Sequence, residues 1–595
     1  MRWSSARGCE VSRALGLVAA LLALASGPVF GVETISLKEI RPGMVGYGLT
    51  VVRGTEISRF EVEVVDVLDE PGERNDFIVV RVFGEAIERS GGIAAGMSGS
   101  PVYFEGRLAG ALSRAAAWSL DRTKPLGLVT PIEAMLKILA ELDTEEIPTP
   151  KEGNLRALGI ERIQLVAVPP EEIPEGTLVA WPLTAPLMVS GLSSRTLALL
   201  REGTDLRLQA HPLLELLPAF QGKLLGLRDL GFTHIYAAPA GGGSAPLEFA
   251  PGAPVGVALA LGDLTVGALG TVTLVDGPKL LAFGHPFLFT GSSRYFLTGA
   301  TVLDTVAAYD ISYKFGSLAE LRGGVFADRW AGIGGRTDRV PLALDVAVDV
   351  RGEAQGKLAA KLVDEPRLTP LLFYVAGVEA VDSALDRIGP GTVEVEYTIS
   401  GRGLPRTFTR KNVFLSTQDV ALYAPWEAAL VLDVLAYNEF RDPGLASVRL
   451  TAKVDPTFKA VEILDLATDR KSYRPGDTVE FTVLVRHWRG DVQSFEGSIR
   501  IPTELRSPYV ELRAYGGPRL RERGEPPKIF ESLADVLDYI EGIPTYDTLT
   551  VELFGIHPIS ELVGEAWLFG VDSVSTKFPG EVVYGKVSLI LPLEE

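Results

Sequence analysis

A serine between two glycines, Ser98, lies in the run Gly96-Met97-Ser98-Gly99-Ser100-Pro101. Glycine and proline at these positions favour a tight turn that exposes the hydroxyl and can direct backbone N–H groups into one small space. A nucleophile for acyl transfer needs such a turn, with an oxyanion hole beside it. We therefore predict Ser98 as a nucleophile, with the N–H groups of Gly96 and Ser98 as the oxyanion hole. A plain turn between two strands is the alternative.

A serine hydroxyl is a weak nucleophile unless a base, normally a histidine, takes its proton. The chain has five histidines, at positions 211, 234, 285, 487 and 557. His285 ends an apolar, strand-like run, Ala282-Phe283-Gly284-His285-Pro286, which would place the imidazole at the rim of a sheet. We predict His285 as the general base. The alternative is a histidine that caps a turn through a ring nitrogen.

The serine turn resembles the Gly-Asp-Ser-Gly-Gly-Pro turn of chymotrypsin-like proteases. It is still more similar to the Gly-Met-Ser-Gly-Ser-Pro turn of the SpoIVB peptidase family, serine peptidases of bacterial sporulation and their relatives. The stretch from Thr271 to His285 resembles the same family, whose catalytic histidine lies in a Gly-His pair at the end of a comparable strand. The match of spacing to the protease turn favours Ser98 over Ser100, the rival nucleophile. The resemblance covers about 35–140 and 250–340, and it implies selective cleavage, often of the enzyme itself.

The sequence departs from the family pattern in two respects. Ser98 precedes His285, whereas the family has the histidine first, so the two halves of a double barrel would be exchanged along the chain. The aspartate that the family has shortly before the serine turn is missing. Asp328, placed after His285 much as in the first barrel of chymotrypsin-like enzymes, is the candidate acid, and Glu85 is the local carboxylate. A Ser–His dyad whose imidazole is oriented by a backbone group is the third option.

The elements around these residues have mostly β patterns. The run 60–67 alternates apolar and polar residues, and Asp276-Gly277 is a hairpin signal between two apolar runs. Helices are expected at 131–139, 193–202, near 213–220, and at 369–388, 425–437 and 529–541. We predict a mainly β chain with an α+β insert: a chymotrypsin-like double β-barrel in permuted order, followed by a C-terminal β-sandwich-like module.

The length of 595 residues requires several domains. We expect a signal peptide at 1–31, a serine-bearing β-barrel half at 32–142, an inserted α+β module at 143–250, a histidine-bearing β-barrel half at 251–350, an α+β extension at 351–458 and a C-terminal immunoglobulin-like β module at 459–595.

The N-terminus reads as an export signal. Arg2, Arg7 and Arg13 precede an apolar run, 14–25, that is too short to span a bilayer, although an uncleaved anchor is the alternative. We expect cleavage near Gly31 and a periplasmic or secreted protein without a membrane span. The single cysteine, Cys9, would leave with the signal, which excludes disulfides and thiolate chemistry.

Composition restricts the partners. The net charge is −19 and no basic block occurs, which argues against nucleic-acid binding. No metal-ligand spacing or phosphate loop is present, so we expect no metal and no cofactor. The favoured function is an exported serine endopeptidase that acts on a protein or peptide. The alternative is a non-catalytic envelope protein that binds a partner, for which the C-terminal module is the candidate surface.

Overall fold

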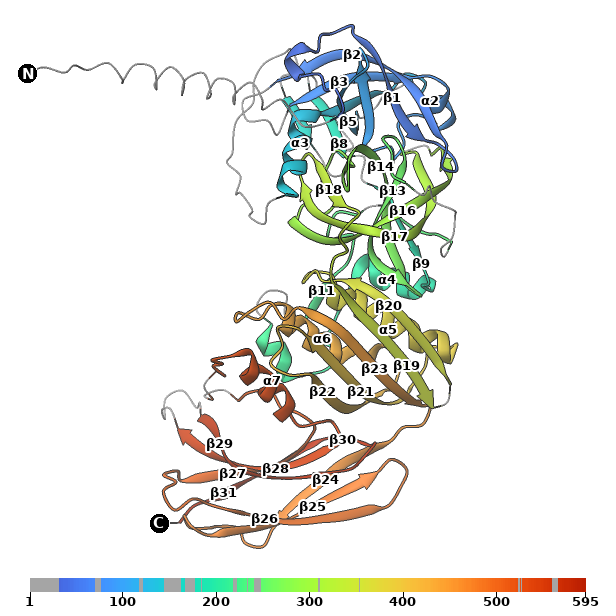
Figure 1. The fold of residues 1–595 in the computed structure, drawn as a ribbon. Helices are drawn as coiled ribbons and strands as arrows, with labels where there is room; N and C mark the ends of the chain where they lie inside the picture. Colours follow the sequence, from blue (N-terminus) through green and yellow to red (C-terminus); the bar gives the residue numbers. More distant parts are fainter. Residues whose placement is uncertain are drawn as a thin grey trace, which may run out of the picture.

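The computed structural model describes residues 31–69, 76–116, 121–143, 162–165, 177–182, 185–217, 222–232, 234–239, 248–308, 311–352, 354–522, 525, 527–558 and 566–594. All but the last residue of the predicted signal peptide therefore lies outside the described residues. The chain is mainly β with few helices, as predicted (Figure 1).

The N-terminal strands close into a six-stranded barrel. These are β1 (Val45–Val51), β2 (Ile57–Leu68), β3 (Phe77–Phe83), β4 (Ser100–Phe104), β5 (Arg107–Ala116) and β6 (Leu126–Pro131). They pair in the order β4-β1-β2-β3-β6-β5, and a β4–β5 pairing closes the ring. Alternation along β2 buries Phe60, Val62 and Val64, because side chains at every second position of a strand share one face. The serine turn lies immediately before β4.

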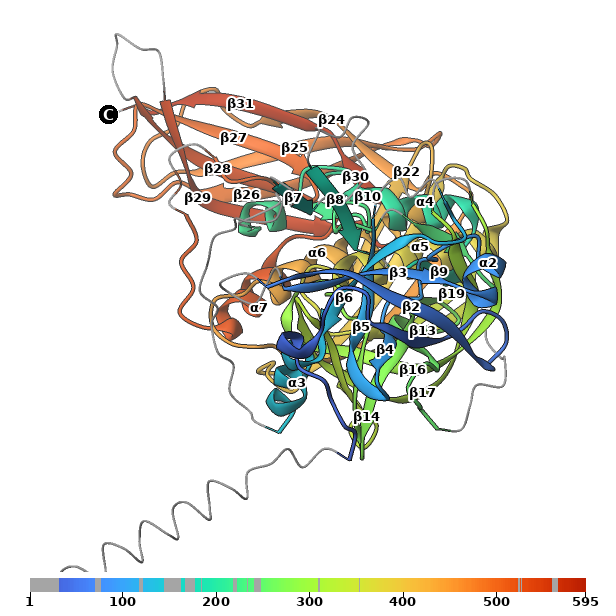
Figure 2. The same ribbon diagram turned by 90° about the horizontal axis from the view of Figure 1, so that it is seen from above.

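A second group of six strands carries the histidine. These are β13 (Pro254–Gly262), β14 (Thr265–Asp276), β15 (Lys279–Ala282), β16 (Gly291–Val306), β17 (Tyr313–Arg329) and β18 (Gly332–Arg336). They pair in the order β14-β15-β18-β17-β16-β13, and β13 pairs with β14 again. The first barrel lies over this group when the molecule is seen from above (Figure 2). Helix α3 (Ile132–Glu141) begins after Pro131 and contacts β15 and β18, so it joins the two groups.

Strands from the segment predicted as an insert join both sheets. β8 (Thr177–Pro182) pairs with β5, and β7 (Arg162–Leu165) pairs with β8. β9 (Leu187–Ser190) pairs with β14, and β12 (Ile235–Ala237) pairs with β9. α4 (Ser194–Glu202) follows β9, with Ser193 as its N-cap. β10 (Gly203–Asp205) and β11 (Lys223–Leu225) form a separate pair.

The remaining chain forms two further layers. β19 (Ala343–Gly352), β20 (Gly356–Val363), β21 (Gly391–Gly401), β22 (Phe408–Ser416) and β23 (Leu445–Asp455) extend the second sheet, and the buried helices α5 (Thr369–Leu385) and α6 (Trp426–Ala436) belong to the same core. Beyond them, two four-stranded sheets share one core. They comprise β24 (Ala460–Thr468), β25 (Thr478–His487), β26 (Val492–Arg500) and β30 (Val582–Tyr584), and β27 (Tyr509–Gly516), β28 (Thr548–Pro558), β29 (Ala566–Lys577) and β31 (Lys586–Pro592). α7 (Leu533–Gly542) lies between β27 and β28 in the chain. The immunoglobulin-like character of this C-terminal module remains a prediction.

No helix within the described ranges has both the length and the apolar character needed to cross a bilayer.

Candidate active site

The backbone of the serine turn leaves two N–H groups without an acceptor. Gly96 and Gly99 both have φ of +92°, a region that glycine enters without strain. The N–H groups of Met97 and Gly99 donate to the carbonyls of Ala94 and Leu112, at 2.9 and 2.8 Å. The N–H groups of Gly96 and Ser98 have no acceptor among the described residues. These are the two groups that the sequence assigned to an oxyanion hole.

The two candidate nucleophiles have different surroundings. The Ser100 hydroxyl donates to the carbonyl of Met97 at 2.7 Å, which closes the turn on itself. The Ser98 side chain is buried, and its Oγ has no hydrogen-bond partner among the described residues. A buried hydroxyl without a partner is costly, and such atoms in folded proteins call for an explanation. Ser98 is thus the hydroxyl that the turn leaves unused.

The serine turn packs directly against the strands of the histidine half. The N–H of Thr271 donates to the carbonyl of Ser98 at 2.9 Å, and the Thr271 hydroxyl donates to the carbonyl of Gly96 at 3.0 Å. A Cβ at Gly99 would lie 2.0 Å from the carbonyl oxygen of Thr271 and 2.5 Å from the nitrogen of Phe283. Only glycine fits this contact. The serine turn therefore contacts Phe283, which lies two residues before His285.

His285 follows two residues in left-handed backbone conformation. Phe283 has φ of +69° and Gly284 has φ of +68°. A bulky residue rarely adopts this conformation, and local backbone strain of this kind concentrates at functional sites. The carbonyl of Gly284 accepts from the Thr130 hydroxyl of the first barrel at 2.7 Å. His285 is 2% exposed, and its Nδ1 lies 2.7 Å from the carbonyl oxygen of Pro286.

Asp328 holds the loop that follows His285. Its buried carboxylate accepts from the N–H groups of Phe287, Leu288 and Thr290, at 2.8, 2.7 and 3.3 Å. Burial raises the pKa of Asp328, and these backbone donors oppose the increase. These contacts are those of a carboxylate that caps a backbone turn. Glu85, the local carboxylate, is exposed on α2 (Glu85–Arg89).

One family comparison covers the serine turn. Residues 32–136 match the SpoIVB peptidase S55 family model. The resemblance predicted from the sequence is therefore confirmed for this segment, which is less than a fifth of the chain, and it indicates a serine peptidase with a protein substrate. His285 and Asp328 lie outside the matched residues. Comparison with curated proteins and with solved structures gives no match.

The sequence prediction missed a lysine beneath the S55-matching turn. Lys314, at the start of β17, is completely buried and donates from Nζ to the hydroxyls of Thr50 and Thr271, at 2.9 and 3.1 Å. Its side chain lies 3.1–3.3 Å from where a Cβ on Gly96 would be. Its N–H donates to the carbonyl of Ala95 at 2.8 Å. The signal in the sequence is a single charge in the otherwise uncharged run 311–319.

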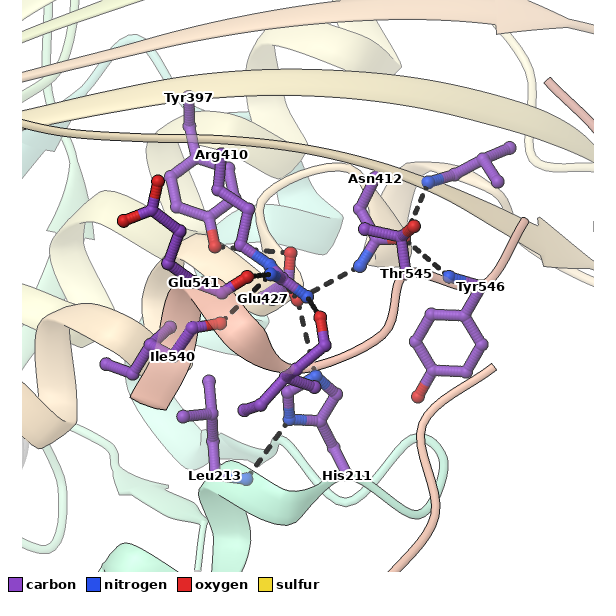
Figure 3. Close-up of polar contacts among 12 residues, drawn as sticks. His211, Leu213, Tyr397, Arg410, Asn412, Glu427, Ile540, Glu541, Thr545 and Tyr546 are labelled. Atoms are coloured by element: carbon purple, nitrogen blue, oxygen red, sulfur yellow. Dashed lines mark hydrogen bonds and ion pairs between the residues drawn. The ribbon is translucent and has the colours of Figure 1, made fainter. Parts of the chain in front are cut away.

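Another histidine, His211, belongs to a buried cluster far along the chain from the S55 segment (Figure 3). Its Nε2 lies 3.3 Å from Oε1 of Glu427 on α6, a close approach without hydrogen-bond geometry. That oxygen also accepts from Arg410 Nε at 2.9 Å and from Asn412 Nδ2 at 3.0 Å. Burial opposes the ionisation of Glu427, but Arg410 and His211 outweigh it and lower its pKa to about 2. His487 pairs with Glu581 in the C-terminal sheets.

Within the described ranges, no three histidine, cysteine, aspartate or glutamate side chains are grouped so that they could hold a metal ion.

Proposed function

We propose that this chain is an exported serine endopeptidase with Ser98 as nucleophile and His285 as general base. One observation carries the proposal. Among the described residues, the N–H groups of Gly96 and Ser98 have no acceptor and the Ser98 hydroxyl has no partner, in a turn packed against the strand end that bears His285. The match to the S55 family supports the reaction class. We interpret the two groups of strands as the halves of a chymotrypsin-like double barrel in exchanged order.

The contacts of His285 favour the tautomer that a general base needs. A carbonyl oxygen only accepts, so the 2.7 Å contact with Pro286 places a proton on Nδ1. In the neutral imidazole Nε2 then carries the lone pair. In the proposed mechanism Nε2 takes the Ser98 proton while Oγ attacks the peptide carbonyl. The N–H groups of Gly96 and Ser98 bind the oxyanion, each donor contributing about 3 kcal/mol. His285 then protonates the leaving amine, and water hydrolyses the acyl-enzyme.

Asp328 acts in this scheme through the backbone. It fixes the loop after His285 by accepting three N–H groups, and the Pro286 carbonyl orients the imidazole. This corresponds to the dyad option, in which a backbone group replaces the triad acid. Both Ser98 and His285 are buried, so a substrate carbonyl reaches Ser98 only after a covering segment moves. Such a closed site supports selective or self-directed cleavage over general digestion.

The decisive experiment is labelling of the purified protein with a fluorophosphonate probe. Wild-type protein should be labelled on Ser98 and should cleave casein or itself. Ser98→Ala should abolish both activities, and His285→Ala should reduce them by at least about 10³-fold. Ser100→Ala is the matched control, because it removes a buried hydroxyl of the same turn that is already bonded to Met97; it should retain labelling. Labelling that persists in Ser98→Ala would contradict the assignment.

Export is tested separately. Expression of the full chain in a bacterium, followed by N-terminal sequencing of the periplasmic and extracellular fractions, should give a mature protein that begins near Val32. Retention of Met1 in the cytoplasm would contradict it.

A non-catalytic envelope protein that binds a partner through the C-terminal sheets is the second candidate. The observation in its favour is that the Ser98 hydroxyl has no hydrogen-bond partner among the described residues, which include His285. Catalytic hydrogen bonds are often long in free enzymes, which is why we rank this reading second. A folded wild-type protein that shows no labelling across pH 5–10 would favour it.

A further inference from the structure

Lys314 is a buried charge without a counter-charge. No ion pair joins its ammonium to a carboxylate among the described residues, and its two partners, Thr50 and Thr271, are neutral hydroxyls. An ammonium has three N–H donors, so two acceptors leave one unused. Burying an unpaired charge is expensive, and proteins usually avoid it outside functional sites.

Among the described residues, the elements packed around Lys314 bring no carboxylate into contact with its ammonium. It is packed among the serine turn, β1, β14 and β16. The other titratable or charged side chains on these elements and on β17 are Tyr47, Asp276, Arg294, Tyr295, Asp304, Tyr313, Glu320, Arg322, Asp328 and Arg329. Burial alone accounts for the lowered pKa of Lys314, so none of these groups perturbs it.

We propose that Lys314 is a positioning residue of the Ser98 turn, which orients the Gly96 N–H and supplies positive charge to the developing oxyanion. The proposal deepens the peptidase function and rests on it. The counter-charge of the Lys314 ammonium would then be the oxyanion, which exists only during the reaction.

The backbone geometry supports the first half of the proposal. Lys314 N–H donates to the carbonyl of Ala95, and this carbonyl shares a peptide group with the Gly96 N–H. In a trans peptide the carbonyl and the N–H point in opposite directions, so fixing one fixes the other. The side chain adds a second restraint, because the Thr271 hydroxyl accepts from Nζ and donates to the carbonyl of Gly96.

The charge supports the second half. A positive group in a buried site stabilises a developing negative charge more than the same group does in water. Burial lowers the pKa of Lys314 to about 7. The ammonium is therefore lost as the pH rises above neutrality, and the activity of Ser98 should decline there.

The test measures the rate of fluorophosphonate labelling of full-length protein from pH 5 to 10. The wild-type rate should fall on the alkaline side, in a limb centred on a pH of about 7. Lys314→Met should lower the maximum rate about 100-fold and abolish the alkaline limb. Lys453→Met, which removes an exposed lysine paired with Glu394, is the control for overall charge and should leave the profile unchanged.

A matched pair of threonine variants separates positioning from fold stability. Thr271→Val breaks the link between Nζ and the Gly96 carbonyl and should lower the rate about 10-fold. Thr50→Val removes only an acceptor of Nζ, so it should move the alkaline limb to lower pH because the ammonium loses a partner. If Lys314 had only a structural role, the alkaline limb of the labelling profile would stay in place in Thr50→Val.

The outcomes distinguish the two proposals. A labelled wild type together with a folded Lys314→Met that keeps the same rate and the same alkaline limb would overturn the role of Lys314 alone. A wild type that is never labelled would overturn the peptidase function, and the role of Lys314 with it.

Discussion

The Ser98 turn and the cluster around Glu427 are two buried polar regions with opposite charge balance. In the cluster, the Glu427 carboxylate meets Arg410 and His211, and the Arg410 guanidinium also donates to the carbonyls of Ile540 and Ile543 (Figure 3). At the turn, the partners of the Lys314 ammonium among the described residues are two hydroxyls, and the Ser98 hydroxyl has none there.

This difference separates a structural role from a functional one. A buried charge that is paired and hydrogen-bonded can persist for structural reasons, since removing either partner leaves the other uncompensated. The Glu427 cluster joins the insert, β22, α6 and α7, so it fixes how these elements are assembled. An unpaired buried charge has no such explanation, which is why the Ser98 turn is the better candidate for chemistry.

Gly99→Ala should have the largest effect at the Ser98 turn. The new Cβ would lie 2.0 Å from the Thr271 carbonyl oxygen, at a φ of +92°, so the turn must separate from β14. We expect a loss of more than about 4 kcal/mol in the free energy of unfolding and no labelling of Ser98. Gly106→Ala is the control: it has φ of +77° but open space around its Cβ, and should cost only about 1–2 kcal/mol. Urea unfolding measures both; equal costs would contradict the contact.

Glu427→Gln should be the most damaging change in the cluster. It removes one charge and leaves Arg410 buried without its counter-ion, which should cost about 3–5 kcal/mol. The rate of Ser98 labelling per folded molecule should stay unchanged. Glu394→Gln, which breaks the exposed pair with Lys453, should cost less than about 1 kcal/mol. A Glu427→Gln variant that kept full stability but was not labelled would contradict the structural role of the cluster.

Local signals made much of the fold predictable. The alternating run 60–67 lies within β2, and the helix expected from Pro131 begins at Ile132. α5 and α6 begin within one residue of the expected positions. These elements are specified by neighbouring residues, through strand patterning and through the proline that precedes or opens each helix.

What the sequence could not supply is contact between distant segments. The closure of the first barrel by β4–β5 pairing, the packing of Gly99 against Phe283 and the position of Lys314 under Gly96 all join residues far apart in the chain or depend on tertiary geometry. Ser98 and His285 were singled out because a serine and a histidine next to glycine in such turns are rare patterns. Lys314 was missed because a single charge in an uncharged run is equally typical of a lysine that faces solvent.

Lys314→Met should stabilise the protein, whereas Glu427→Gln should destabilise it. Below pH 7 the amine is charged in both the folded and the unfolded state, so the full cost of burying it is present. Between pH 7 and 10.5 the unfolded state binds more protons, and wild-type stability rises. The difference between the folded and unfolded pKa of Lys314 corresponds to about 5 kcal/mol in the free energy of unfolding. In the variant, the two lost hydrogen bonds offset part of this gain.

The variant should therefore exceed the wild type by about 3 kcal/mol in the free energy of unfolding at pH 6, and the advantage should disappear by pH 10.5. Denaturant unfolding at several pH values gives this difference. If Lys314→Met were less stable than the wild type at pH 6, the Lys314 ammonium would be compensated as well as the Glu427 carboxylate is.

Asp328→Asn should have the smallest effect, and it tests whether Asp328 acts through the loop. An amide offers one acceptor oxygen, and its NH₂ would face the N–H groups of Phe287, Leu288 or Thr290, so the loop after His285 should loosen. A displaced imidazole should slow Ser98 labelling about 10-fold. Asp338→Asn, at an exposed aspartate paired with Arg336 in the same half, should change nothing. A loss near 10⁴-fold would instead identify Asp328 as a direct triad acid, because that is the scale on which the loss of such a carboxylate slows catalysis.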